Sequence, residues 1–309
     1  LYQEPYIRRI NNEIDKVLAQ DKEAYTPQDF VHFDSLHYCG NEWIKEFFDS
    51  INVAQGRTLK VLELCSGFGS TARFLATNYP VEITCLDYSA SFNTINERIN
   101  GIIGLTNIKT MQGDITQLPV GKGGLTETFD VIFSQQSIYH NEDRISVYSG
   151  CFQALKEGGR IYIEDFNIEH PQHIFTPEER TALANFHFHG FVSNKGYEQL
   201  LKDAGFSIDS TVSRTREWSL YVFDRAELFL RIKDQIVREY GQEVFDSRYI
   251  RGIENTPKLY HDLGLTPEQV VERFPLLTAH WGKDNLLHWV FEVPQKAGGI
   301  YIAGSKVNT

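Results

Sequence analysis

Short apolar stretches alternate with amphipathic stretches over the first two thirds of the chain. Apolar residues recur every three or four positions in the longer stretches, as at Phe92, Ile95 and Ile99, which predicts amphipathic helices. The shorter stretches predict buried strands of a parallel sheet: Val61–Leu64, Val81–Leu86, Ile108–Met111, Phe129–Phe133 and Ile161–Phe166. This alternation predicts an α/β fold in which helices flank a mostly parallel sheet.

The two ends of the chain add further elements. Residues 1–24 carry one amphipathic stripe, and Trp43–Ile51 carries another. A helix at Lys195–Ala204 leads to a strand at Phe206–Val212, and the last apolar run, Gly299–Gly304, predicts a final strand. Roughly 85 residues separate these two strands, far too many for a hairpin connection.

Those intervening residues predict a helical insertion. A helix is expected over Asp224–Tyr240, and another begins at the capping box Thr266–Gln269. We therefore predict three parts: N-terminal helices with a segment that covers the ligand site, residues 1–58; the sheet domain, residues 59–212 with 298–309; and a helical cap, residues 213–297. A helical appendage for oligomer contacts is the alternative to a substrate cap.

The stretch Lys60–Leu75 combines a strand, a glycine turn and a helix. Gly67 and Gly69 let the backbone approach a ligand, and the helix N-terminus offers unpaired N–H groups. Two interpretations fit. The glycines, with Asp87 as the ribose acid, match a dinucleotide fingerprint. Alternatively Glu63, an acid just before the turn, suits a cationic ligand better than a pyrophosphate.

Polar residues follow the next strands as well. Asp87-Tyr88 follows the second strand, Asp114-Ile115 follows the third, and the fourth leads into Ser134–His140. A helix over Arg144–Leu155 then runs through Lys156-Glu157-Gly158-Gly159 into the fifth strand. Because the carboxyl ends of parallel strands meet at one edge of a sheet, these residues are expected at one ligand site.

In this order the motifs resemble those of class I S-adenosylmethionine-dependent methyltransferases, over roughly residues 30–212. Ser134–His140 resembles the corresponding region of glycine, sarcosine, dimethylglycine and phosphoethanolamine N-methyltransferases. Asp34–Gly40 resembles the segment that folds over the donor's methionine end in such enzymes. Cys65 departs from the family pattern, which has a glycine there. Four matching strand ends favour this class over a nicotinamide enzyme, which requires only the first two.

The resemblance implies a Rossmann-like seven-stranded, mostly parallel sheet with flanking helices and the C-terminal helical cap inserted before the last strand. In such a site Asp87 would accept the ribose hydroxyls, Asp114 would accept the adenine amino group, and Ile115 would pack on the ring. The residues expected to bind the donor are His37, Tyr38, Glu63, Cys65, Ser66, Gly67, Gly69, Asp87, Tyr88, Asp114, Ile115 and Gln135. Tyr38 and His140 are also the predicted catalytic residues. The alternative is that Tyr38 fills the core and His140 caps the following helix.

The composition of the chain argues against some classes of binding partner. A net charge of -11 without a basic block argues against nucleic acid and anionic membranes, and the chain has no apolar run long enough for membrane insertion. The four scattered cysteines predict reduced thiols in the cytoplasm. His187 and His189 form a His-x-His pair without a third ligand at a compatible spacing, so no metal is expected.

We therefore expect an S-adenosylmethionine-dependent methyltransferase that releases S-adenosylhomocysteine. The acceptor is expected to be a small molecule, with an amine favoured by the Ser134–His140 stretch. One alternative is O- or C-methylation of a larger apolar ring, which the aromatic residues of the insertion would suit. The other is a methyltransferase fold that binds the donor without turnover. A homo-oligomer is compatible with the sequence.

Overall fold

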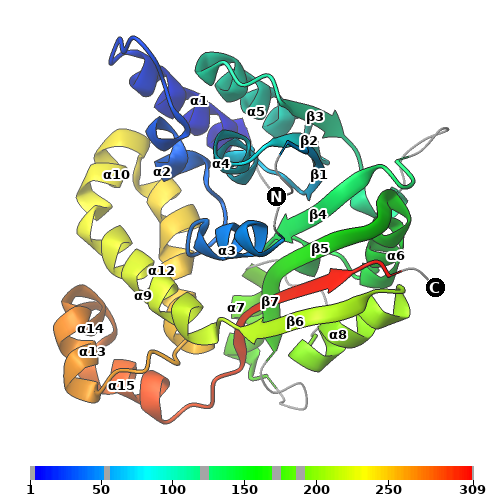
Figure 1. Cartoon of the computed structure of the whole chain (residues 1–309). Coiled ribbons are helices and arrows are strands. Elements are labelled where there is room, and N and C mark those ends of the chain that lie inside the picture. The colour runs from blue at the N-terminus through cyan, green and yellow to red at the C-terminus, as the bar shows by residue number, and fades with distance from the viewer. Residues whose placement is uncertain (1–3, 52–55, 119–124, 169–174, 186–191, 308–309) are drawn as a thin grey trace. The chain divides into compact units, whose positions relative to one another are not determined.

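The computed structural model describes residues 4–51, 56–118, 125–168, 175–185 and 192–307. In this part of the chain seven strands form one sheet in the order β3-β2-β1-β4-β5-β7-β6 (Figure 1). The pairs β1–β2, β1–β4, β2–β3 and β4–β5 are parallel, and Val61 lies beside both Ile83 and Val131. The strands are β1 Leu59–Leu64, β2 Val81–Asp87, β3 Ile108–Gln112, β4 Phe129–Gln135, β5 Leu155–Ile168, β6 Ser207–Ser213 and β7 Ala297–Ser305.

The last strand runs against its neighbours. Lys306 exchanges backbone hydrogen bonds with Gly158 and Gly159 near the start of β5. Near the start of β7, the carbonyl of Gly299 accepts a hydrogen bond from the N–H of Arg214, just past the end of β6. This pairing makes β7 antiparallel between β5 and β6. The predicted seven-stranded, mostly parallel sheet is therefore confirmed, as is a final strand that follows a series of helices.

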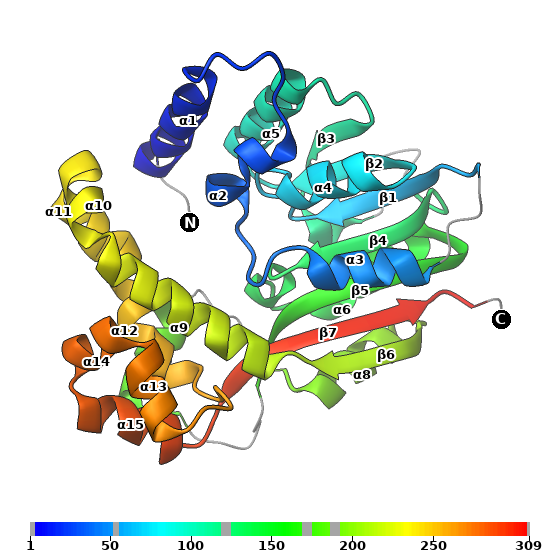
Figure 2. The same cartoon turned by 60° about the vertical axis from the view of Figure 1, so that its left-hand side comes forward.

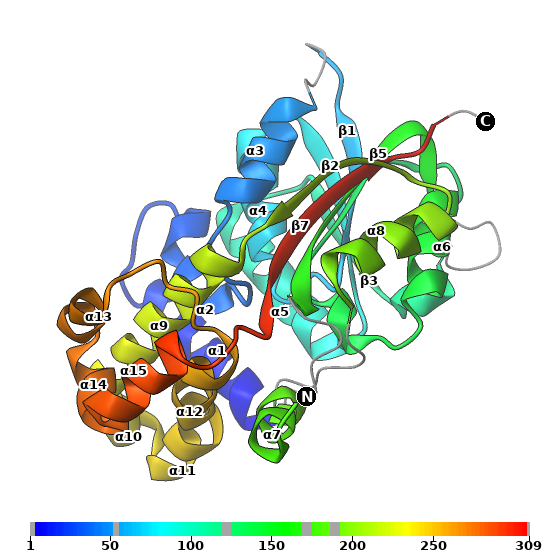
Figure 3. The same cartoon turned by 90° about the horizontal axis from the view of Figure 1, so that it is seen from below.

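Helices lie on both faces of the sheet: α3 and α4 on one face, α6 on the other (Figure 3). The first eight helices are α1 Glu4–Leu18, α2 Val31–Asp34, α3 Glu42–Ser50, α4 Ser70–Asn78, α5 Ala90–Ile103, α6 Arg144–Ala154, α7 Pro177–Asn185 and α8 Asn194–Asp203. The later ones are α9 Thr215–Arg231, α10 Lys233–Tyr240, α11 Gln242–Val244, α12 Ile250–Leu259, α13 Pro267–Arg273, α14 Pro275–Trp281 and α15 Lys283–Phe291. Short 3-10 turns form η1 Pro27–Asp29, η2 Ile115–Gln117 and η3 Ile138–His140, and a π turn forms η4 Phe245–Tyr249.

The chain divides into two compact units. Unit 1 comprises residues 1–165, 198–210 and 302–309, and unit 2 comprises residues 166–197 and 211–301. Unit 1 thus includes the N-terminal helices, and unit 2 includes α7, which lies within the predicted sheet domain, residues 59–212. The assignment of residues 213–297 as a substrate cap stays a prediction.

Unit 1 buries the N-terminal helix against α5. Ile10 and Ile14 of α1 lie in one cluster with Ile95 and Ile99 of α5. Phe68, from the glycine turn, belongs to the same cluster and is 1% exposed, with its ring 4.5 Å from that of Phe92. The apolar stripe of α1 therefore helps to anchor the turn at which the candidate site lies.

Unit 2 is mainly helical, and α9 packs against α12 and α14 (Figure 2). Trp218 of α9 is fully buried, and its ring lies 4.7 Å from that of Phe166. The carboxylate of Glu227 accepts the first free N–H groups of α14, those of Leu276 and Leu277, each at 2.9 Å. Among the described residues, no helix has the length and apolar character needed to cross a membrane.

Two predicted helices have wrong bounds. The helix expected over residues 1–24 ends at Leu18, because the hydroxyl of Tyr25 bonds the Leu18 carbonyl and Asp21 turns the chain with φ at +48°. The helix expected over Asp224–Tyr240 is instead α9 followed by α10, with a break at Ile232. It starts earlier because the segment around Trp218 buries its apolar side chains.

Candidate functional site

The glycine turn forms at the carboxyl end of β1. Cys65, Gly67 and Gly69 all adopt left-handed backbone conformations, with φ of +52°, +56° and +78°. Glycine tolerates this conformation and cysteine does so only with strain, so Cys65 is a strained residue at the centre of the candidate site. A Cβ atom on Gly69 would lie 2.1 Å from the Oδ1 atom of Asn96, so only glycine fits there. Burial raises the pKa of the Cys65 thiol, which therefore stays protonated at neutral pH.

Asp87 joins this turn to the end of β2. One of its carboxylate oxygens accepts the N–H of Gly67 and the other accepts the N–H of Ser89, both at 2.8 Å. Burial raises the pKa of Asp87, although the two backbone N–H groups partly oppose the shift. The carboxylate is therefore held rigidly at the strand end.

Glu63 is a buried acid on β1. Its side chain accepts the Cys85 thiol at 3.5 Å, and burial raises its pKa to about 8, against the opposing effects of that thiol and of the Arg73 charge. Near neutral pH the carboxyl group is thus largely protonated in the absence of a ligand. A cation beside it would favour the ionised form.

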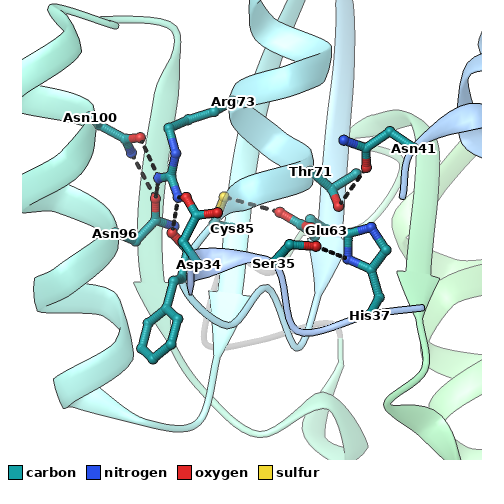
Figure 4. A network of polar contacts seen from close by, with 11 residues as sticks. Asp34, Ser35, His37, Asn41, Glu63, Thr71, Arg73, Cys85, Asn96 and Asn100 are labelled. Carbon is teal, nitrogen blue, oxygen red and sulfur yellow. Dashed lines mark hydrogen bonds and ion pairs between the residues drawn. The ribbon is translucent and has the colours of Figure 1, made fainter. Parts of the chain in front are cut away.

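Arg73 of α4 is fully buried and connects several parts of the site (Figure 4). Its guanidinium donates to Asp34 at 2.7 Å, to the carbonyl of Phe68 in the glycine turn, and to Asn96 and Asn100 of α5 at 2.9 Å each. This network fixes α2, the glycine turn and α5 to one another. The sequence suggested no such role, because a helical arginine usually points into solvent.

The segment Asp34–Gly40, which we call the covering segment, follows α2. His37 is buried, with Nε2 3.0 Å from the Gly40 carbonyl and Nδ1 3.5 Å from the Ser35 hydroxyl. Burial lowers the pKa of His37, so its imidazole is neutral near pH 7. Tyr38 is 5% exposed, and its backbone N–H donates to Oε1 of Gln136 at 2.8 Å. The structure thus brings the covering segment to the end of β4.

Gln135 ends β4, Gln136 directly follows it, and both side chains donate to a buried acid on β5. Thr71 donates to Oε1 of Gln135 at 2.7 Å, and Nε2 of Gln135 donates to Glu164 at 3.1 Å. Nε2 of Gln136 donates to the same carboxylate at 2.8 Å. The predicted site residues did not include Thr71, Gln136 or Glu164. The available signal was the acidic pair Glu164-Asp165 within the run Ile161–Phe166 of β5.

The remaining predicted residues lie at the same strand ends with different exposures. Asp114 accepts the N–H of Thr116 at 2.9 Å as the N-cap of η2, and Ile115 is buried. Tyr88 has 78% of its surface exposed, so its ring does not pack among the buried residues of the candidate site. The next helix, α6, has Asp143 as its N-cap, so the alternative that His140 caps it is wrong. His140 instead ends η3, partly buried, with its ring centroid 3.8 Å from that of Tyr139.

The arrangement suits a cationic organic ligand better than a metal ion. Glu63 is the penultimate residue of β1, Asp87 ends β2, and Asp114 lies two residues past the end of β3. Within the described ranges, no group of three His, Cys, Asp or Glu side chains could hold a metal ion. The His187–His189 pair considered above lies outside the described residues.

Comparison with known proteins defines the class. Residues 61–159 match the "Methyltransferase domain" family. "Phosphoethanolamine N-methyltransferase 1" of Zea mays is 28% identical over 216 residues, which cover 67% of this chain and 39% of that protein. "Sarcosine/dimethylglycine N-methyltransferase" of Aphanothece halophytica is 26% identical over 190 residues, which cover 60% of this chain and 66% of that protein.

The fold is also similar to that of solved methyltransferase structures. A solved structure of Haemonchus contortus phosphoethanolamine N-methyltransferase 2, in complex with phosphomonomethylethanolamine and S-adenosylhomocysteine, superposes with a TM-score of 0.67. The match covers 89% of this chain and 55% of that chain at 14% identity. Residues 61–159 therefore match a methyltransferase domain, and the chain has the Rossmann-like methyltransferase fold. Its sequence relatives are phosphoethanolamine and sarcosine/dimethylglycine N-methyltransferases, which confirms the resemblance inferred from the strand-end motifs.

Proposed function

We propose that this protein transfers a methyl group from S-adenosylmethionine to the nitrogen of a small amine. The observation that carries the proposal is the pair of buried carboxyl groups, Glu63 and Asp87, on either side of the left-handed turn Cys65–Gly69. Matches to N-methyltransferases support the amine, but the chain spans only 39% of the plant relative's length, so the acceptor is inferred from chemistry and similarity together.

The residues of the site fit the donor. Glu63, whose pKa of about 8 falls when a cation approaches, would hold the donor's cationic methionine end. Asp87 would accept the ribose hydroxyls by charge-assisted hydrogen bonds, and Asp114 with Ile115 would hold the adenine. The bound donor supplies a methyl group on a sulfonium.

The chain's own residues then have two tasks. They hold the acceptor in line with the methyl group and keep water out, which can contribute several kcal/mol to the rate. They also accept the proton if the amine arrives protonated. We assign this second task to His140 and the orientation of the acceptor to Tyr38, whose aromatic face favours a cationic centre.

A screen of product masses tests the function. The protein would be incubated with S-adenosylmethionine and panels of amines, phenols and isoprenoid rings, and a mass gain of one methyl would be sought along with S-adenosylhomocysteine. Amines alone should gain the methyl. Methylation confined to phenols or rings would replace the proposal with O- or C-methylation.

Ligand-induced stabilisation tests the donor separately. S-adenosylmethionine and S-adenosylhomocysteine should raise the melting temperature, since a ligand at 100 times its Kd stabilises the fold by about 2.7 kcal/mol. NAD(H) and NADP(H) serve as controls and should leave it unchanged. Stabilisation by the nicotinamide nucleotides alone would contradict the donor assignment.

The variant His140→Ala separates chemistry from binding. A contact made chiefly in the transition state affects kcat, so kcat should fall roughly tenfold or more while the donor Kd stays within about twofold. Single-turnover rates and calorimetric titrations would measure the two quantities. Full turnover by His140→Ala would remove this residue from the mechanism.

The setting of the reaction completes the proposal. All four cysteines are free thiols, which suits a reducing compartment, and we propose the cytoplasm. We also propose that the partner is the small-molecule acceptor rather than nucleic acid, and that residues 213–297 shape the acceptor pocket.

A further inference from the structure

Glu164 accepts hydrogen bonds from three side chains, and the proposed methyl transfer does not explain them. It lies on β5 and is 1% exposed. Tyr162, two residues earlier on the same face of the strand, donates its hydroxyl to Oε2 at 3.0 Å. Gln135 donates to the same oxygen at 3.1 Å, and Gln136 donates to Oε1 at 2.8 Å. Three donors thus converge on one carboxyl group, which is the pattern that an ionised carboxylate accepts.

The Glu164 carboxylate determines the orientation of the Gln135 and Gln136 side-chain amides. Because it accepts hydrogen bonds, both amide nitrogens face it and both amide oxygens face away. The oxygen of Gln135 accepts the Thr71 hydroxyl, and that of Gln136 accepts the backbone N–H of Tyr38. The chain of contacts therefore runs from β5 through β4 to the covering segment.

Gln136 is held on its backbone as well. Its N–H donates to the carbonyl of Glu164 at 2.6 Å, and its φ is +53°, a left-handed conformation that is uncommon for glutamine. Strain of this kind persists where the surroundings over-determine the geometry, and it concentrates at functional sites. Cys39, beside Tyr38, has φ at +62°, so both ends of the Tyr38–Gln136 contact lie next to strained backbone.

We propose that Glu164 is a positioning residue that orients Gln135 and Gln136 and, through Gln136, fixes the backbone of Tyr38. The inference rests on the proposed function in so far as Tyr38 meets the acceptor. The contact network itself is independent of that role, which allows the two to be tested apart.

Hydrogen exchange of the Tyr38 amide reads the network directly. Glu164→Gln keeps the shape of the side chain but offers one acceptor oxygen in place of two, so Gln136 should lose its orientation. The Tyr38 amide should then exchange at least about tenfold faster than in the unchanged protein. In methyl transfer kcat should fall about tenfold, while KM for the acceptor changes less, because misplacement affects the reacting geometry.

Two further variants make the test specific. Glu157→Gln is the matched control, because Glu157 lies on the same strand with 51% of its side chain exposed, and it should change neither quantity. Adding Gln136→Glu to Glu164→Gln exchanges the amide and the carboxylate between the two positions, and should return Tyr38 exchange to within about threefold of the original rate. If Glu164→Gln does not fold, Glu164→Asp, which shortens the reach while keeping the charge, replaces it with the same expected acceleration.

The outcomes separate the two proposals. Unchanged exchange at Tyr38 in a folded Glu164 variant overturns the positioning role, whatever the activity. Failure of the double exchange to restore protection does so too. Accelerated exchange in a protein that methylates no amine supports the positioning role and refutes the proposed function instead.

Discussion

At the scale of single residues, the site combines groups that favour function over stability. The raised pKa of Glu63 means that the folded chain holds its proton more tightly than the unfolded chain does. Stability is therefore lost as pH rises from the ordinary value of 4.5 through about 8, and the loss is complete above that pH. A donor cation would reverse this preference by stabilising the ionised form.

The variant Glu63→Gln tests whether ionisation of Glu63 destabilises the free protein. It removes the ionisation and keeps the shape, so at pH 8 the free protein should melt roughly 2–4 °C higher for each kcal/mol regained. Well below pH 4.5, where Glu63 is protonated in both the folded and the unfolded chain, the gain should vanish. Scanning calorimetry at both pH values, with donor titrations, would measure it. Donor affinity should fall in the variant, and a variant that melted lower at pH 8 would contradict the assigned cost of ionisation.

At the scale of elements, the glycine turn is held by neighbours that are distant in sequence. Gly69 and Gly104 have nearly the same φ, +78° and +80°, but a Cβ on Gly69 would collide with Asn96, whereas a Cβ on Gly104 would meet nothing within 4 Å. The two positions therefore separate backbone strain from steric conflict. Gly104 is the C-cap of α5, and its N–H donates to the carbonyls of Asn100 and Gly101, so it is a fair reference for a left-handed glycine.

Replacing each glycine by alanine should give different losses. Gly104→Ala should cost about 1–2 kcal/mol, the strain of a left-handed alanine. Gly69→Ala should cost that much again or more and should also weaken donor binding, because Asn96 must move and it holds Arg73. Chemical denaturation and donor titration would measure both. Equal losses in the two variants would show that the close approach to Asn96 has no energetic weight.

The sequence predicted several buried strands better than it predicted the helix around Trp218, for a physical reason. Buried parallel strands are marked by their own apolar residues, so β1, β2 and β4 fell close to their expected bounds. The start of α9 depends on Trp218 packing against Phe166, about 50 residues earlier, which no local pattern carries. In the site, strand-end acids were predictable from topology, whereas Arg73 and Glu164 were not, because their roles depend on partners brought together by folding.

At the scale of the whole molecule, the predicted donor residues all belong to unit 1, and unit 2 has a separate buried ion pair. Lys296 contacts Glu179, and their side chains are 4% and 1% exposed. The positive charge of Lys296 also adds to burial in lowering the pKa of His261 to about 4. Removing one partner of such a pair leaves an uncompensated buried charge.

The variant Lys296→Met should therefore destabilise unit 2 without touching the donor site. The expected loss is roughly 3–5 kcal/mol, the range for breaking a buried pair from one side. The pKa of His261 should rise from about 4, since one of its causes is removed. Lys283→Met, at an exposed position at the start of α15, is the control and should change neither the free energy of unfolding nor the pKa of His261.

Three measurements follow the effect of Lys296→Met. Denaturation curves would measure the free energy of unfolding, histidine NMR titration the pKa of His261, and calorimetry below the unfolding transition the donor Kd. Donor Kd should stay within about twofold, because the predicted donor residues all belong to unit 1 and Lys296 belongs to unit 2. A large loss of donor affinity in the folded variant would mean that donor binding depends on unit 2 as well as on the strand ends of unit 1.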